Sequence, residues 1–483
     1  ELARLAPAEV LVAEGSVNET LEIISEAGAA ATELPQEVFD STAGVDRICK
    51  AYGVRDLSGL GEFGRADIAA ISGLIEYLST TQKGQLPLLR RPVYEARDDF
   101  VAIDAATRRN LELTQTLSGE RSGSLLSVID RSVTAAGARL LARRITTPSQ
   151  RLATIEERAS AVAFFGEQSG LRGAVRTTLK QLPDVERALG RVALDRSGPR
   201  DLRALGNGIA QATQVYALLQ QHDLPPLLQN AAADLKGFEG LSDELDRAMV
   251  AEPPLLARDG GFVATGYSAE LDETTALRDE ARSVIAKMQA EYAGQSEISS
   301  LKIKHNNVLG YFIETTATHA QRMMAAPLSE TFIHRQTTAN AVRFTTVELG
   351  DLETKILNAA GRATGLELEI FAGLCAQVLD HAAALQALAV SIAEIDVAAA
   401  LAELAMSKGW VRPILNDSRD FIIEQGRHPV VEAAIKAQAT TVFVANDCHL
   451  TSNGDMVWLL TGPNMAGKST FLRQNSLIAL LAQ

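Results

Sequence analysis

The segment from Thr461 to Thr470 constrains the fold of this chain more than any other. It reads Thr-Gly-Pro-Asn-Met-Ala-Gly-Lys-Ser-Thr, with two glycines separated by four residues and followed by Lys and Ser. The apolar run 456–460 before it predicts a buried strand, and residues 471–482 after it predict a helix. A strand, such a loop and a helix in this order indicate the start of an α/β domain that binds nucleotide phosphates.

The residue types in this loop suit a phosphate group. The glycines let backbone N–H groups close around phosphate oxygens, and the positive end of the helix dipole adds to the attraction. A lysine here reaches the β- and γ-phosphates, and the serine hydroxyl is a ligand for Mg²⁺. The expected nucleotide contacts are Gly462, Pro463, Asn464, Met465, Ala466, Gly467, Lys468, Ser469 and Thr470, with Lys468 in the catalytic role and Ser469 on the metal.

The wording of the loop resembles the nucleotide loop of the MutS family of DNA mismatch-repair ATPases. Three further blocks, in family order, extend the resemblance over most of the chain. Residues 104–112 resemble the start of the family's lever core, residues 309–314 and 335–345 resemble its DNA clamp, and residues 426–432 resemble the lead-in to its ATPase domain. One departure is Ala466, where the family usually has glycine, and its methyl group is tolerable only if this residue keeps φ below zero.

The resemblance implies a multidomain α and α/β fold with ATP and Mg²⁺ as cofactors. It also implies mismatched double-stranded DNA as the substrate, a homodimer, a MutL-type partner and the replication sliding clamp. Phe443 precedes the loop as the family's adenine-stacking aromatic does, and the alternative is a core phenylalanine. The expected segments are a partial α/β connector domain (1–97), the first part of an all-α lever core (98–290), an inserted β-rich DNA clamp (291–352), a coiled-coil-like lever helix (353–409) and the start of an ABC-type P-loop ATPase domain (410–483).

The clamp segment is basic inside an acidic chain. The whole chain carries a net charge of −14, whereas residues 300–345 carry five bases against two acids. Two strands are predicted around a turn at 306–310, and bases two residues apart on a strand project from one face. The surface predicted to contact phosphates consists of Lys302, Lys304, Arg322, Arg335 and Arg343. The alternative is a solvated strand edge.

The remaining patterns are mainly helical. Residues 9–12 predict a strand, and residues 67–79 and 271–290 predict helices. Residues 353–408 predict the most regular helix, about 75 Å long if continuous, with apolar residues spaced three and four apart. His381 lies on this apolar seam and is predicted to be a core histidine rather than a ligand. Five arginines are predicted to form ion pairs or a solvated face of the helical core rather than DNA contacts, namely Arg108, Arg109, Arg139, Arg143 and Arg144.

Composition and the chain ends give further expectations. Cys49, Cys375 and Cys448 lack the spacing of a zinc site or disulfide framework, which favours reduced thiols in the cytoplasm. No run of eighteen apolar residues and no signal peptide occur, so we expect no membrane partner. The chain starts at Glu1 and ends in the helix after the loop. We therefore expect the middle of a longer protein, without the mismatch-reading domain or a Walker-B carboxylate, and without ATPase activity by itself.

Three other functions stay open. A MutS homologue that acts in recombination would keep the lever, clamp and ATPase without reading mismatches. A coiled-coil ATPase of chromosome structure would place its phosphate loop before the coiled coil, whereas here it follows. A DNA-holding scaffold would bind nucleotide without hydrolysing it. Residues 165–167 and 312–314 match the family's three-letter mismatch-reading motif, but neither has its N-terminal setting, so the role is assigned to neither.

Overall fold

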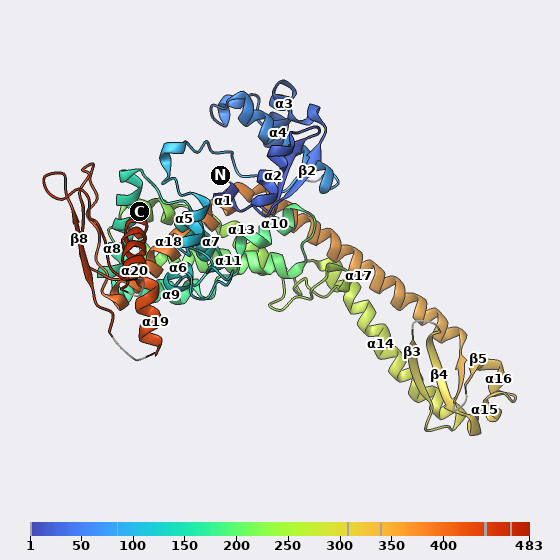
Figure 1. The fold of residues 1–483 in the computed structure, drawn as a ribbon. Coiled ribbons are helices and arrows are strands. Elements are labelled where there is room, and N and C mark those ends of the chain that lie inside the picture. The colour runs from blue at the N-terminus through green and yellow to red at the C-terminus, as the bar shows by residue number, and fades with distance from the viewer. Residues whose placement is uncertain (1, 85, 307–308, 339–340, 439–441, 464–465) are drawn as a thin grey trace. The chain divides into compact units, whose positions relative to one another are not determined.

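A computed structural model shows the protein as two compact units (Figure 1). It describes residues 2–84, 86–306, 309–338, 341–438, 442–463 and 466–483, except for the side chains at 97 and 277–282. One unit comprises residues 1–197, 204–242 and 378–483, and the other comprises residues 198–203 and 243–377. Among these described residues helices predominate, and three small sheets interrupt them.

The first unit begins with a small α/β part. Strands β1 (Glu9–Ala13) and β2 (Ala30–Leu34) pair in parallel, and helix α2 (Asn18–Glu26) connects them. Helices α3 (Ser41–Tyr52) and α4 (Arg65–Thr81) pack against each other beside them. The predicted strand at 9–12 and the predicted helix at 67–79 are both confirmed.

Helix α18 (Ala382–Lys408) forms the centre of the helical core in the first unit. The helices that pack on it most extensively in the described part of the chain are α7 (Ala135–Thr146), α8 (Leu152–Glu167), α9 (Ser169–Leu179), α10 (Val185–Ala193) and α12 (Pro226–Ala233). By length and composition α18 could cross a membrane, but 67% of its most apolar window is buried inside the protein. This burial identifies α18 as a core helix. The first unit also contains α1 (Leu2–Leu5), α5 (Ala105–Asn110) and α6 (Leu125–Ile129). Helices α11 (Pro199–Leu219) and α13 (Glu239–Ala248) each have residues in both units.

The prediction of one continuous helix from 353 to 408 is wrong. Helix α17 (Val347–Asp380) ends one residue before His381, and α18 starts one residue after it. The prediction that His381 lies in the core is also wrong, because this residue is exposed at the N-cap of α18. An imidazole buried on an apolar seam needs a hydrogen-bond partner, whereas the interruption leaves the ring at the surface. The apolar seam positions Leu374, Val378, Leu385, Leu388, Ile392 and Ile395 are buried as predicted.

The second unit contains a four-stranded antiparallel sheet with the order β3-β4-β6-β5. Its strands are β3 (Lys302–Asn306), β4 (Gly310–Thr316), β5 (Ile333–Thr337) and β6 (Ala341–Thr345), and the short helices α15 (Ala317–Met323) and α16 (Leu328–Thr331) lie between β4 and β5. One face buries Ile313 and Phe344 in a cluster with residues of α14 (Ala269–Ser296). The predicted helix at 271–290 and both predicted strands are confirmed.

The C-terminal part of the first unit carries an antiparallel pair, β7 (Phe421–Gly426) and β8 (Asn446–Leu450), with helices α19 (Pro429–Gln438) and α20 (Lys468–Leu481). The predicted helix after the loop is confirmed and begins at Lys468. The predicted buried strand at 456–460 is wrong, because this segment has no regular secondary structure and Val457 is 86% and Leu459 88% exposed. A buried parallel strand needs neighbours on both sides. In the described part of the chain β7 and β8 pair only with each other.

Candidate phosphate-binding loop and nucleic-acid interface

The loop before α20 has the backbone of an anion site. Gly462 has a φ of 139° and Gly467 has a φ of 80°, conformations that residues with a Cβ rarely adopt. Gly467 is the N-cap of α20 and gives it no side-chain cap. The first N–H groups of a helix have no acceptor within it. The start of α20, which includes Ser469 and Thr470, therefore offers donors to an anion.

Lys468 supplies a positive charge to this loop. Its ammonium group donates a hydrogen bond to the carbonyl oxygen of Gly462, so the side chain folds back over the loop. The amide of Ala466 donates to the carbonyl of Pro463 at 3.1 Å. The described residues of the loop thus fit a phosphate group. Asn464 and Met465 lie outside the described residues, and the φ condition on Ala466 involves Met465 and stays a prediction.

Helix α20 is anchored in the helical core on its other side. Leu477 is 1% exposed and belongs to one cluster with Leu113 and Val397. Arg473 Nη1 lies 3.6 Å from Glu112 Oε2, and Glu112 Oε1 accepts a hydrogen bond from the Leu117 amide at 2.8 Å. The phosphate loop therefore leads into a helix that contacts the block at 104–112. Sequence reasoning missed this ion pair because 361 positions separate its two members.

The block at 426–432 has a structural role beside α20. A Cβ on Gly426 would lie 2.7 Å from the Ile423 side chain. Arg427 donates to Glu432 at 2.9 Å, and the Nδ1 atom of His428 accepts from the Val431 amide at 3.3 Å. Burial lowers the pKa of His428, so its ring is neutral at pH 7.

A cavity of about 370 Å³ lies between β7, β8, the segment at 458–460 and α20. Its lining is mainly apolar and includes Phe421, Trp458 and Phe471. Phe443 is half-buried and does not line this cavity. The structure therefore does not bring Phe443 and the cavity together, and the stacking role of Phe443 stays a prediction.

Bases of the clamp segment gather on the outward face of its sheet. The strand register places Lys302 opposite Glu314, and Glu314 opposite Arg343, so these side chains share one face. Lys304 is two residues from Lys302 on the same face. The buried Ile313 and Phe344 occupy the opposite face, which packs on α14.

The five candidate bases of the clamp differ in their partners. Lys304 Nζ donates to Glu314 Oε1 at 2.6 Å, and Arg343 Nε lies 3.3 Å from Glu314 Oε2. The hydrogen bond from Lys304, and then the one from Arg343, lowers the pKa of Glu314 against the opposing effect of burial. Arg322 on α15 pairs with Glu297 away from this face. Lys302 and Arg335 are exposed, and neither has an ion pair among the described residues.

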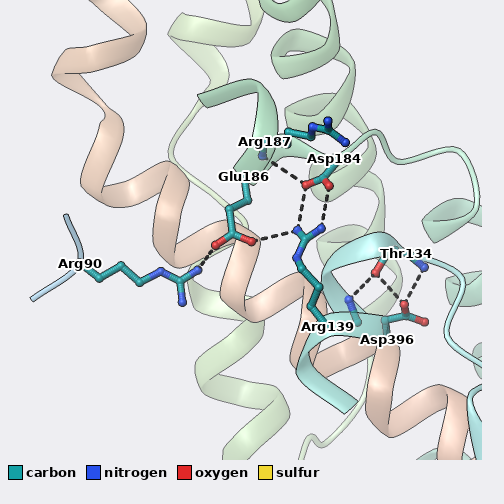
Figure 2. A network of polar contacts seen from close by, with 8 residues as sticks. Arg90, Thr134, Arg139, Asp184, Glu186, Arg187 and Asp396 are labelled. Atoms are coloured by element: carbon teal, nitrogen blue, oxygen red, sulfur yellow. Dashed lines mark hydrogen bonds and ion pairs between the residues drawn. The ribbon is translucent and has the colours of Figure 1, made fainter. Parts of the chain in front are cut away.

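Two of the five arginines predicted to form ion pairs or a solvated face, Arg139 and Arg144, form ion pairs. Figure 2 shows the network around Arg139. Arg139 on α7 donates to both carboxylate oxygens of Asp184 at 2.8 and 3.0 Å and to Glu186 at 2.9 Å. Arg90 pairs with the other oxygen of Glu186. The hydrogen bonds from Arg139 lower the pKa of Asp184, although burial raises it. This network joins residue 90 to the helical core.

Comparison with known proteins decides the family. The family model of MutS domain II matches residues 1–90, that of MutS domain III matches residues 106–402, and that of MutS domain V matches residues 458–483. The domain III match alone covers more than half of the chain. The chain belongs to the MutS family.

Curated MutS relatives match along the whole chain. It is 57% identical over 485 residues to the DNA mismatch repair protein MutS of Roseobacter denitrificans. It is 58% identical to the proteins of the same name from Dinoroseobacter shibae, over 483 residues, and Paracoccus denitrificans, over 484 residues. Each comparison covers 100% of this chain and 55% of the relative, so the chain spans little more than half the length of these MutS proteins. The resemblance of the chain to the MutS family is thereby confirmed, whereas the assignment of single blocks to the clamp, lever and ATPase lead-in and the five segment boundaries stay predictions.

Proposed function

We propose that this chain is part of an ATP-switched protein that binds mismatched duplex DNA for repair. The observation that carries the proposal is the MutS domain III match over 106–402, in a chain that also holds a phosphate loop and an outward basic sheet. The relatives are named DNA mismatch repair proteins, which favours mismatch repair over recombination or a passive scaffold. We further propose a cytoplasmic homodimer that works with a MutL-type partner and the replication sliding clamp.

The phosphate loop is proposed to hold ATP together with Mg²⁺. The N–H groups at the start of α20 and the backbone around Gly467 would bind phosphate oxygens. Lys468 would exchange its contact with the Gly462 carbonyl for the β- and γ-phosphates, and Ser469 would hold Mg²⁺. When bound, Mg²⁺ neutralises charge that develops on the phosphates during hydrolysis. Hydrolysis also needs a water molecule positioned by groups outside the loop. We therefore expect residues 1–483 alone to show no ATPase activity above background in a phosphate-release assay. Turnover that disappears in Lys468→Ala would contradict this.

The nucleotide assignment is tested by Lys468→Ala in the full-length protein. The change removes a charge-assisted contact worth about 1.5–3 kcal/mol, so ATP binding should weaken at least about tenfold in a calorimetric titration. Lys436→Ala is the matched control, because Lys436 is an exposed lysine on α19 outside the loop. Equal ATP affinity in the Lys468→Ala and Lys436→Ala variants would overturn the assignment.

The clamp is proposed to contact DNA phosphates first through Lys302 and Arg335, the two bases that the described structure leaves exposed without an ion pair. Such contacts give affinity without reading sequence. Lys302→Ala combined with Arg335→Ala should reduce the slope of log K against log salt by about 1.8, equally on matched and mismatched duplexes. Fluorescence anisotropy at several salt concentrations measures this. The control pair is Lys180→Ala with Arg131→Ala, two exposed bases outside the clamp. An unchanged slope in the clamp variant would remove this face from the DNA interface.

A further inference from the structure

One carboxylate lies at the centre of the outward face of the clamp sheet. Glu314 on β4 pairs in register with Lys302 on β3 and with Arg343 on β6. Its two carboxylate oxygens contact different bases. Oε1 lies 2.6 Å from the ammonium of Lys304, and Oε2 lies 3.3 Å from the Nε atom of Arg343. Its side chain is only 19% exposed. A single acid therefore neutralises two of the three bases that the sheet brings to this face.

A carboxylate and a DNA phosphate compete for the same donors. Lysine and arginine bind both groups through charge-assisted hydrogen bonds. A phosphate that approaches Lys304 or Arg343 must displace Glu314 or remain beside its negative charge, and like charges at an interface oppose binding. The lowered pKa of Glu314 keeps it ionised at neutral pH, so this competition persists under ordinary binding conditions.

Arg343 is also held by contacts that do not depend on the charge of Glu314. Its Nη1 donates to Gln336 Oε1 at 2.8 Å, and its guanidinium lies 4.6 Å from the ring centroid of Phe312. Replacing Glu314 by glutamine keeps the size of the side chain and leaves an oxygen that accepts from Lys304. The variant therefore removes the negative charge while the packing around Phe312 is retained.

We propose that Glu314 attenuates DNA binding by the clamp, because it occupies Lys304 and Arg343 in place of DNA phosphates. The inference rests on the proposed function of the clamp. With Glu314 in place, phosphate contacts fall mainly to Lys302 and Arg335. A clamp segment with Lys302, Lys304, Arg335 and Arg343 all available would bind every duplex more tightly, matched or mismatched, and would release it more slowly. Glu314 thus lowers the electrostatic affinity that carries no sequence information.

The test is Glu314→Gln in the full-length protein, measured by fluorescence anisotropy on matched and mismatched duplexes across a salt series. Release of Lys304 and Arg343 from the carboxylate charge should raise affinity about threefold to tenfold at low salt and steepen the salt slope by up to about 1.8, equally on both duplexes. The control is Glu270→Gln, which removes one negative charge from an exposed ion pair with Arg362 outside the sheet. It should change affinity much less.

A second variant separates attenuation from a structural effect. Lys304→Ala should lower DNA affinity more in the Glu314→Gln background than in the wild-type background, because Lys304 reaches phosphate only when Glu314 is neutral. Equal effects of Lys304→Ala in the two backgrounds would overturn the inference. A second result would also overturn the inference. In it, Glu314→Gln binds DNA no more tightly than Glu270→Gln, while the double variant of Lys302 and Arg335 still loses affinity. If that double variant binds normally as well, the proposed DNA interface itself is wrong.

Discussion

Asp396 should be one of the side chains on which the stability of the helical core depends most strongly. It lies on α18 with no exposed surface and accepts hydrogen bonds from the Val133 amide at 3.1 Å, the Thr134 amide at 2.8 Å and the Thr134 hydroxyl at 2.6 Å. The Thr134 hydroxyl in turn accepts from the Gly137 amide at 2.9 Å and caps α7 (Figure 2). One carboxylate thus joins the central helix to the start of α7.

Asp396→Ala leaves three donors without this acceptor. Unsatisfied buried groups cost about 1–3 kcal/mol each, and part of this is offset because the desolvation of the charged carboxylate is also removed. We expect the free energy of unfolding to fall by about 3–5 kcal/mol in urea titrations followed by circular dichroism. Ser391→Ala is the control on the same helix, since it removes one hydrogen bond to Asp234 and should cost about 1 kcal/mol. A loss below about 1 kcal/mol in Asp396→Ala would refute this reasoning.

The pH dependence of the same site has a definite sign. Burial raises the pKa of Asp396 in the folded protein, against the effect of its hydrogen bonds. The stability that this shift contributes is fully present below the unfolded pKa of about 3.9 and is lost as pH rises through the folded pKa. The asparagine in Asp396→Asn does not titrate. The loss in free energy of unfolding relative to the wild type should therefore be larger at pH 5 than at pH 8. A loss in free energy of unfolding that increases with pH would show that the hydrogen bonds affect the pKa of Asp396 more than burial does.

Two further predictions concern single backbone positions. Gly310 has a φ of 71°, and a Cβ there would lie 1.8 Å from Glu353 Oε1. Gly310→Ala should therefore cost about 1–3 kcal/mol in thermal unfolding, whereas Gly294→Ala on α14, with no atom within 4 Å of its Cβ, should be neutral or stabilising. Ala466→Gly should leave ATP affinity within about threefold in calorimetry, and a larger change would show that the methyl group affects phosphate binding.

Local sequence patterns were sufficient for much of the fold. The glycine spacing around Lys468 and the helix after it follow from short-range rules, as do β1, α4, α14 and the β3–β4 hairpin. The seam of α17 and α18 could also be predicted, because its apolar spacing reflects burial. The interruption at His381 could not, since the histidine fits the same spacing as its apolar neighbours.

Features that depend on distant partners could not be predicted. The apolar segment around Leu459 has the composition of a buried strand, but burial depends on neighbouring strands rather than on composition. Charge counting identified the basic clamp segment. It could not show that Glu314 occupies Lys304 and Arg343, because that depends on the register of three strands. The Arg473–Glu112 contact is equally invisible to local patterns.

The central claim is that nucleotide bound at the loop switches duplex DNA binding, and ATP-dependent DNA affinity tests it most directly. Anisotropy titrations of the full-length protein on a mismatched duplex, with and without ATP and Mg²⁺, should show an ATP-dependent change in affinity of about fivefold or more. The change should disappear in Lys468→Ala and persist in Lys436→Ala. An equal ATP response in Lys468→Ala, or no response in the wild-type protein, would contradict the account.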